Sequence, residues 1–169
     1  VYNFDNKYLL QTNIRYDGSS RFHKNHRWGV FPSFSAGWVM SEEFFMKEID
    51  ELSYLKLRGS WGRLGNEKIG LYPYQSTIGF NSLLLYKGNS VVSAQGAGVL
   101  DYSIPDISWE TSESYDIGID VGFFNNKLMI TGDYYKKTTK DMLLAIQIPS
   151  FIGMNNPQQY TGKMYTKGW

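Results

Sequence analysis

Residues 109–142 read WETSESYDIGIDVGFFNNKLMITGDYYKKTTKDM, and they carry the clearest structural pattern in the sequence. From Tyr115 to Phe123 apolar residues take the odd positions, while aspartate or glycine takes the even ones. This period of two is typical of a strand whose two faces meet different surroundings. Asn125 and Asn126 then interrupt the pattern, and both tolerate the positive φ that a tight type I′ turn requires. The stretch therefore predicts one long β-hairpin.

The turn also fixes the register of this hairpin, because it sets Phe124 opposite Lys127. The predicted apolar pairs are Phe123 with Leu128, Val121 with Ile130 and Ile117 with Tyr134. The predicted polar pairs are Asp120 with Thr131, Gly118 with Asp133 and Asp116 with Tyr135. Both arms thus agree on which side is apolar, and the hairpin is typical of a wall between two different solvents.

The composition fits such a wall, although its mean hydropathy is only −0.37. No run of about 18 apolar residues exists, so we expect no transmembrane helix. A transmembrane barrel needs an apolar residue only at every second position, so average hydropathy underestimates it. The net charge of +1 gives no basic footprint for nucleic acid. The lack of cysteine excludes disulfides and thiolate metal sites.

Three further segments alternate in the same way, namely residues 7–17, 28–40 and 54–64. In the third, the polar face is predicted to carry Lys56, Arg58, Ser60 and Arg63. In the second, Trp28 and Trp38 share a face and lie about 33 Å apart at about 3.3 Å per residue. With a tilt of about 40° this projects to about 25 Å, the height of a barrel's lipid-facing band. Pro32 predicts a bulge or a local break in pairing there.

The connections alternate between short and long. Residues 41–53 and the Asn125–Asn126 turn are short, and Ser41 is expected to cap one or two helical turns. Residues 17–27, 65–108 and 143–157 are long, and an inner hairpin is expected around YPYQSTIGF and SLLLYKG within the second of them. Short turns at one rim and long loops at the other are typical of an outer-membrane barrel. The final YTGKMYTKGW reads as a strand without a partner, so we expect a piece of a longer protein.

Five stretches carry a family resemblance: YLLQTNIRYDGSSRF, WGVFPSFSAGWVMSEEFF, LKLRGSWGRLGN, ISWETSESYDIGIDVGFFNNKLMITGDYYKKTTKDMLL and GKMYTKGW. In order and spacing they resemble the barrel strands of SusC/RagA-type TonB-dependent outer-membrane transporters of Bacteroidetes. The resemblance implies an all-β fold: an antiparallel transmembrane β-barrel segment, part of a barrel of about 22 strands, with long extracellular loops and short periplasmic turns. Residues 1–169 would be part of the barrel domain, with the plug domain and the TonB box outside this chain.

The same resemblance implies a function. The chain would belong to a nutrient importer for oligosaccharides or peptides in the outer membrane of a Gram-negative cell, and it would be no enzyme. Its partners would be a SusD-like surface lipoprotein that lids the barrel, TonB acting through the plug, outer-membrane lipid, and a glycan or peptide substrate. No cofactor and no nucleic acid are implied.

Two other functions stay open from the residues themselves. A soluble β-sandwich that binds carbohydrate could stack sugars on aromatic platforms such as Trp61, Tyr72, Tyr74 and Tyr86. Its apolar faces would then pack on each other, and it would remain soluble without detergent. A passive porin would lack both the plug and the TonB box in its complete sequence.

Catalytic and metal-binding hypotheses are weaker. The carboxylates between Glu110 and Asp141 could supply a glycosidase pair, but polar inward residues are what a barrel wall normally carries. His23 and His26 have the spacing of a metal-binding pair, yet only Asp17 lies near them in the sequence. The run KKTTK, residues 136–140, is better explained by a solvated rim at the level of lipid headgroups. We therefore predict neither a catalytic nor a metal site.

Substrate contacts, if this part of the protein makes any, are expected on the long loops and the rim. The candidates are Arg21, His23, Asn66, Tyr72 and Tyr74. The aromatic-rich segment 65–108 could instead pack against the lipoprotein.

Overall fold

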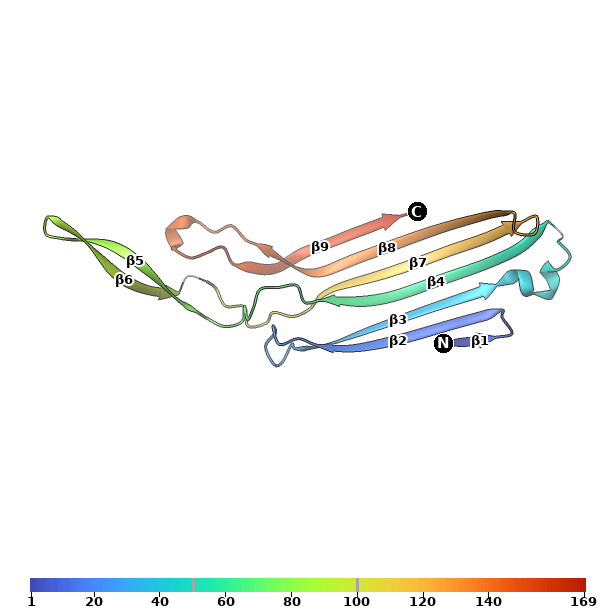
Figure 1. The fold of residues 1–169 in the computed structure, drawn as a ribbon, viewed down its shortest axis with the longest axis horizontal. Helices are drawn as coiled ribbons and strands as arrows, with labels where there is room; N and C mark the ends of the chain where they lie inside the picture. Colours follow the sequence, from blue (N-terminus) through green and yellow to red (C-terminus); the bar gives the residue numbers. More distant parts are fainter. Residues whose placement is uncertain (50, 100) are drawn as a thin grey trace.

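The computed structural model describes residues 1–49, 51–99 and 101–169. Seven strands form one antiparallel sheet in the order β1-β2-β3-β4-β7-β8-β9, and β5 and β6 form a separate hairpin. In Figure 1 the long strands run side by side, while β5 and β6 project beyond the sheet at its long-loop end. This arrangement confirms the predicted antiparallel all-β fold.

The strands of the large sheet are β1 (Tyr2–Phe4), β2 (Tyr8–Gly18), β3 (Trp28–Val39), β4 (Leu52–Asn66), β7 (Glu110–Phe123), β8 (Leu128–Ala145) and β9 (Gln158–Gly168). The separate hairpin consists of β5 (Ile78–Lys87) and β6 (Ser90–Val99). Three short 3₁₀ helices complete the described elements: η1 (Met40–Glu42), η2 (Phe44–Met46) and η3 (Ser150–Ile152). None of the helices in the described residues has the length and apolar character needed to cross a membrane.

The hairpin of β7 and β8 has the predicted register throughout, from Phe123 opposite Leu128 to Asp116 opposite Tyr135 and beyond. The turn is closed by the amide of Lys127, which donates to the carbonyl of Phe124 at 3.3 Å. Asn125 and Asn126 have φ values of 56° and 60°, as a type I′ turn requires. Phe124 also has a positive φ of 53°, which the sequence did not indicate.

Aromatic pairs mark both ends of the β2–β3 pair. Tyr16 stacks on Trp28 with ring centroids 4.9 Å apart, and Tyr8 stacks on Trp38 at 6.4 Å. All four side chains share one face, because Tyr16 is opposite Val30 and Tyr8 is opposite Trp38 in an unbroken register. Two aromatic levels at this spacing are those expected of a membrane-spanning wall.

The ladder between β3 and β4 ends at Ser33 opposite Gly62, directly beside Pro32. Pairing of β3 with β2 continues through Pro32, which lies opposite Ile14. The predicted local break is therefore confirmed, and it affects only one side of the strand. Proline cannot donate a ladder hydrogen bond, which explains why the β4 side is lost there.

Three local predictions were wrong. Ser41 caps nothing: η1 follows Val39 without a side-chain cap, and the buried hydroxyl of Ser41 has no hydrogen-bond partner. The predicted inner hairpin exists, but its arms were misplaced: it turns at Gly88, with φ 62°, so SLLLYKG continues the strand that begins at Ile78 instead of pairing with it. Arg63 pairs with Glu113 in a register that is unbroken from Tyr54 to Asn66, so it lies on the apolar face, not on the inward polar one.

The large sheet is a single layer whose apolar face has no cover. Ile14, Val30 and Ile117 on this face are 72%, 53% and 68% exposed. In a β-sandwich these side chains would pack against a second sheet. No second sheet packs on this face within the described residues, so the fold does not support the sandwich. We call this face outward and the opposite, polar face inward.

Candidate functional site

A buried apolar cluster lies at the long-loop end of the sheet. It consists of Phe22, Phe31, Ile107 and Trp109, and the first and third of these are 0% exposed. The ring of Trp109 lies 5.1 Å from that of Phe22 and 5.2 Å from that of Phe31. Its indole Nε1 donates to the carbonyl of Arg27 at 3.3 Å. The loop before β3 and the loop before β7 are thus held against each other.

Four of the five candidate substrate residues come together beside this cluster. Arg21 donates from Nη1 to the carbonyl of Ile69 at 2.7 Å, which joins the loop before β3 to the segment after β4. His23 meets Tyr74 edge-on at 5.6 Å, and Tyr72 meets Tyr74 edge-on at 6.3 Å. The result is a group of one cation, one imidazole and two phenol rings at the loop end of the wall. Their role in substrate binding stays a prediction.

Asn66 lies apart from that group, and its amide is used within the fold. Its Nδ2 donates to Glu110 Oε1 at 3.2 Å, and its Oδ1 accepts from the amide of Lys68 at 3.0 Å. The residue closes the end of β4 against β7. It borders a small hollow of about 70 Å³ that Asp141 and Tyr160 also line.

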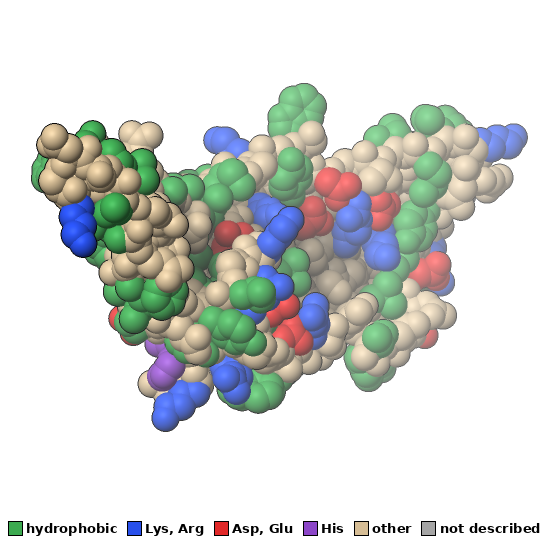
Figure 2. Space-filling model, turned by 60° about the vertical axis from the view of Figure 1, so that its left-hand side comes forward, with side chains coloured by type: hydrophobic (Ala, Val, Ile, Leu, Met, Phe, Trp, Pro, Cys, Tyr) green, Lys and Arg blue, Asp and Glu red, His purple; other side chains and the backbone are tan. Residues whose placement is uncertain are grey.

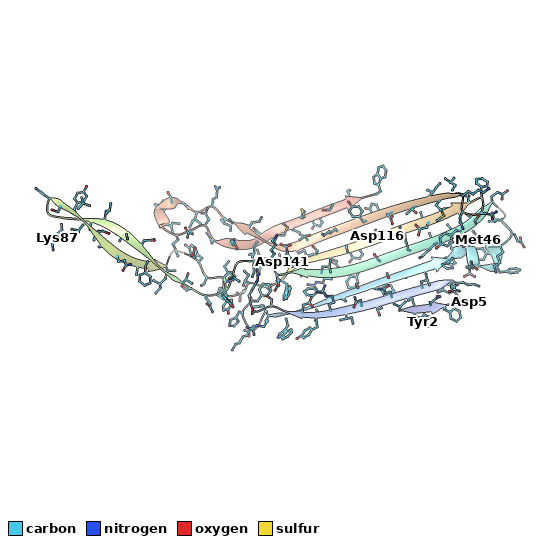
Figure 3. The ribbon with its side chains drawn as sticks, in the orientation of Figure 1. Tyr2, Asp5, Met46, Lys87, Asp116 and Asp141 are labelled. Atoms are coloured by element: carbon cyan, nitrogen blue, oxygen red, sulfur yellow. The ribbon has the colours of Figure 1, made fainter. Side chains whose placement is uncertain are left out.

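The inward face carries a network of ion pairs at mid-strand. Arg58 on β4 lies 3.8 Å from Asp116, 3.2 Å from Asp120 and 2.6 Å from Asp133. Thr131 donates a further hydrogen bond to Asp120 at 3.1 Å. Figure 2 shows acidic and basic side chains beside one another in the hollowed part of the surface, and Figure 3 places Asp116 midway along β7. The alternation of the sequence predicts these carboxylates on the inward face, but nothing local in the sequence connects Arg58 to them.

This network is negative overall, because three carboxylates surround one guanidinium. A hollow of about 390 Å³ lies next to it, and its exposed lining is mostly apolar. Its polar lining residues are Gln11, Ser35, Lys56, Arg58, Ser60 and Asp116. The polar groups can hydrogen-bond a molecule whose other parts contact the apolar lining. Since every carboxylate here is directed at the guanidinium, the arrangement is an ion-pair network and not an acid–base pair poised for catalysis.

The histidine spacing does not produce a metal centre. His26 Nε2 lies 3.8 Å from Asp106 Oδ1, while His23 contacts Tyr74. Across residues 1–49, 51–99 and 101–169, no three His, Asp or Glu side chains gather closely enough to hold a metal ion.

Comparison with known proteins identifies the family of this chain. The family described as TonB dependent receptor-like, beta-barrel matches residues 1–169. The chain belongs to the TonB-dependent receptor β-barrel family. Its seven-stranded sheet is accordingly a segment of a barrel wall, with the apolar row facing lipid and the polar row facing the lumen.

Similar proteins include TonB-dependent receptors from two organisms. The chain is 38% identical to a TonB-dependent receptor of Formosa agariphila over 99% of its length, and 36% identical to the TonB-dependent receptor SusC of Bacteroides thetaiotaomicron over 95%. Each match covers 16% of the relative. The structure of the RagAB peptide importer superposes with a TM-score of 0.80 at 32% identity, covering 97% of this chain and 17% of that one. This TonB-dependent barrel segment therefore spans about a sixth of its relatives.

Proposed function

We propose that the chain is part of the barrel of a TonB-dependent receptor that imports oligosaccharides or peptides across the outer membrane. The observation that carries this proposal is the two-sided wall: an apolar row bounded by aromatic pairs on one face, and a charged polar row on the other. A plug and a TonB box, contributed by other parts of the same protein, would couple transport to TonB. In this proposal residues 1–169 are barrel alone, and the wall supplies binding and passage without chemistry.

Substrate class follows from the inward face and the loop end. The hollow beside Arg58 combines a mostly apolar lining with hydroxyl, amide and charged groups, which suits a glycan or a peptide that has both apolar and polar faces. At the loop end, Tyr72 and Tyr74 offer aromatic faces, and stacking on such rings is a common way to bind sugars or peptide side chains. One similar structure is described as a peptide importer, which supports the peptide class.

A SusD-like lipoprotein is the proposed partner at the long-loop end, which we place outside the cell. The β5–β6 hairpin supports this proposal, because it projects beyond the sheet with Lys87 at its tip (Figure 3). Phe80, Leu84 and Tyr86 share one of its faces and are 69%, 74% and 83% exposed. A lone two-stranded hairpin is marginally stable, and an apolar patch of this kind normally meets another protein.

Uptake by the complete receptor tests the function. The parent gene is expressed with its neighbouring lipoprotein gene in a host that lacks both, and uptake of labelled oligosaccharides and peptides is measured with and without TonB. We expect saturable uptake of one of the two classes that is lost without TonB. Uptake that is linear in concentration and independent of TonB would instead establish the porin.

The candidate binding residues are tested in the same assay. Tyr72→Ala and Tyr74→Ala should each raise the substrate concentration at half-maximal uptake about fivefold to tenfold, since stacking on one aromatic ring is worth roughly 1 kcal/mol. Arg21→Gln and His23→Ala should act in the same direction. Asn66→Ala should leave half-saturation unchanged but destabilise the end of β4. Phe44→Ala, at the opposite rim, is the control.

A further inference from the structure

Charged side chains on the outward face gather in one place. In the regularly paired part of the seven described strands, every charged residue on this face lies toward the loop end of β4, β7, β8 and β9. These residues are Arg63, Glu113, Lys136, Lys140 and Lys167. Lys163 lies beside the register shift between β8 and β9, but it shares the outward face of β9, because its ammonium lies 5.0 Å from the ring of Tyr165. We call the five cations among them the outward basic cluster. The outward rows of β1, β2 and β3 carry no charge, so the cluster is local and not a general feature of the wall.

Two members of the cluster face each other directly. Lys136 on β8 lies opposite Lys167 on β9, and both are exposed. Like charges at directly opposed positions of a sheet destabilise it. Among the described residues, no carboxylate lies within 4 Å of either ammonium group. The fold therefore holds two cations together without an anion of its own between them.

The single acid in the group is already engaged. Glu113 accepts hydrogen bonds from the indole of Trp61 at 2.9 Å and the phenol of Tyr115 at 3.0 Å. Its other oxygen lies 3.9 Å from the ammonium of Lys140. Asp141, in the bulge next to Lys140, lines the same hollow as Arg63. Two carboxylates cannot balance five cations, so the surface remains positive.

The cluster lies beside an aromatic level of the outward face. Trp61 and Tyr115 are directly opposite each other, and Tyr115 is also opposite Lys136. Tyrosine and tryptophan in this position mark the boundary between hydrocarbon and headgroups. Below them, toward the short turn, the row continues with Ile117 and Leu57, which face hydrocarbon. The ladder row of Trp61 and Tyr115 runs on to Phe34 on β3, and since barrel strands tilt by about 40°, one row changes depth from strand to strand. In the proposed orientation the cations lie on the loop side of the apolar row, at the depth of the lipid phosphates.

We propose that the outward basic cluster binds the phosphate groups of an anionic lipid in the leaflet on the long-loop side. The inference rests on the proposed membrane-spanning function. Lys136 and Lys167 would hold one phosphate between them, while Lys140, Lys163 and Arg63 flank it. A lipid is favoured over a free anion, because the apolar row directly below the cations accommodates the acyl chains of the same molecule. The tail and the headgroup are then bound by adjoining surfaces.

Binding of lipid to the complete receptor tests this site. The full-length protein is purified in a neutral detergent, and diphosphoryl lipid A is titrated while bound lipid is counted by native mass spectrometry. The double variant Lys136→Gln/Lys167→Gln should bind about 25-fold more weakly, at about fivefold for each cation removed near a charged membrane surface. Dephosphorylated lipid A should bind wild type as weakly as the phosphorylated lipid binds this variant.

Two matched variants distinguish a specific loss of lipid binding from a loss caused by misfolding. Lys56→Gln/Lys137→Gln removes the same charge from the inward face and should leave lipid binding unchanged. Glu113→Gln keeps an acceptor for Trp61 and Tyr115 but removes the acid nearest to Lys140, and should bind lipid more tightly than wild type. Opposite effects from neighbouring substitutions cannot come from misfolding.

Several outcomes would overturn the proposal. Equal loss of binding in the outward and inward double variants would show that only overall charge matters. Full competition by millimolar inorganic phosphate would show a free-anion site in place of a lipid site. A variant that binds no lipid yet inserts and transports normally leaves the proposed function intact, whereas a receptor that never enters membranes refutes the proposed function itself.

Discussion

The guanidinium of Arg58 lies across Gly118, the residue directly opposite it on the neighbouring strand. A Cβ atom at position 118 would come within 2.7 Å of Arg58 Cζ. The missing side chain at this position is what allows the guanidinium to reach beyond β7 and meet Asp133 on β8 at 2.6 Å. One glycine thus permits an ion-pair network across three strands of the inner wall.

Gly118→Ala should break the contact between Arg58 and Asp133 while the strands keep their register. The added Cβ meets the far ends of two flexible side chains and no backbone, so the side chains move instead. Both partners are about a third exposed, at 33% and 38%, so the pair is worth on the order of 0.5 kcal/mol. A double-mutant cycle with Arg58→Gln, followed by thermal unfolding in detergent, measures the coupling.

Gly59→Ala is the matched control, because its new Cβ would have no neighbour closer than 3.9 Å. It should be additive with Arg58→Gln. Additivity of Gly118→Ala as well would mean that the glycine does not govern the network.

Ile119→Arg should impair insertion of the barrel into membranes. Ile119 lies on the outward face opposite Leu57 and between Ile117 and Val121 in the apolar row, so the arginine would enter hydrocarbon. Such a charge costs about 2–4 kcal/mol at the midplane of a β-barrel wall. The outer-membrane fraction of the full-length protein, assayed by its resistance to heat denaturation, measures the effect.

Thr131→Arg places the same charge one row away but on the inward face, opposite Asp120. It should insert normally. Equal behaviour of the two arginine variants would reject the assignment of the faces.

Sequence alone predicted the β7–β8 hairpin pair by pair, because its turn and its alternation are both local. The face predicted for Arg63 was wrong, because the prediction followed the charge of the side chain and not its odd position in the strand. In an unbroken register the parity of a residue decides its face, and Arg63 has the parity of Leu57 and Trp61. The outward basic cluster becomes visible only with this correction.

Other features could not be read from the sequence, because they depend on distant pairing. The partner of β4 is β7, and the whole β5–β6 hairpin lies between them in the chain. Arg58 meets its three aspartates only through that pairing. The contact of Phe22 with Trp109 has the same origin, since no periodicity connects two loops so far apart. The turn at Gly88 was missed because apolar residues continue without interruption through SLLLY.

Glu43 should make the free energy of unfolding depend on pH in the acid range, at the rim that carries the short connection of residues 41–53. Its carboxylate accepts hydrogen bonds from Tyr8 at 2.7 Å and Trp38 at 3.1 Å, and these bonds, with Lys7 nearby, hold the pKa of Glu43 below its ordinary value of 4.5. A lowered folded-state pKa contributes stability above the unfolded value. That stability is lost as the pH falls from about 4.5 through the folded-state pKa.

Glu43→Gln keeps an oxygen acceptor for both donors but cannot titrate, so its unfolding temperature should vary less below pH 4.5 than that of wild type. Tryptophan fluorescence during thermal unfolding in detergent follows the change, since Trp38 contacts this side chain. Glu48→Gln, an exposed acid of the same connection, should leave the wild-type pH dependence in place. Identical acid profiles for wild type and Glu43→Gln would contradict the assignment.

Phe22→Ala should release the loops at the long-loop end without unfolding the wall. Phe22 is fully buried against Trp109, and removing a buried phenylalanine side chain costs about 3–5 kcal/mol. The loss falls on loop packing, because the strands are held by their own ladders. Hydrogen exchange should therefore speed up in the segments around Arg21 and Ile69 while β7 and β8 remain protected.

The loss of Phe22 should also weaken substrate binding, because Arg21, His23 and Tyr74 depend on the same loop packing for their relative positions. The substrate concentration at half-maximal uptake should rise, while the amount of receptor in the membrane stays constant. Phe44→Ala removes an 83% exposed ring at the opposite rim and should change neither quantity. If exchange in β7 rose together with exchange in the loops, the apolar cluster would be part of the fold of the wall and not a separate clamp on its loops.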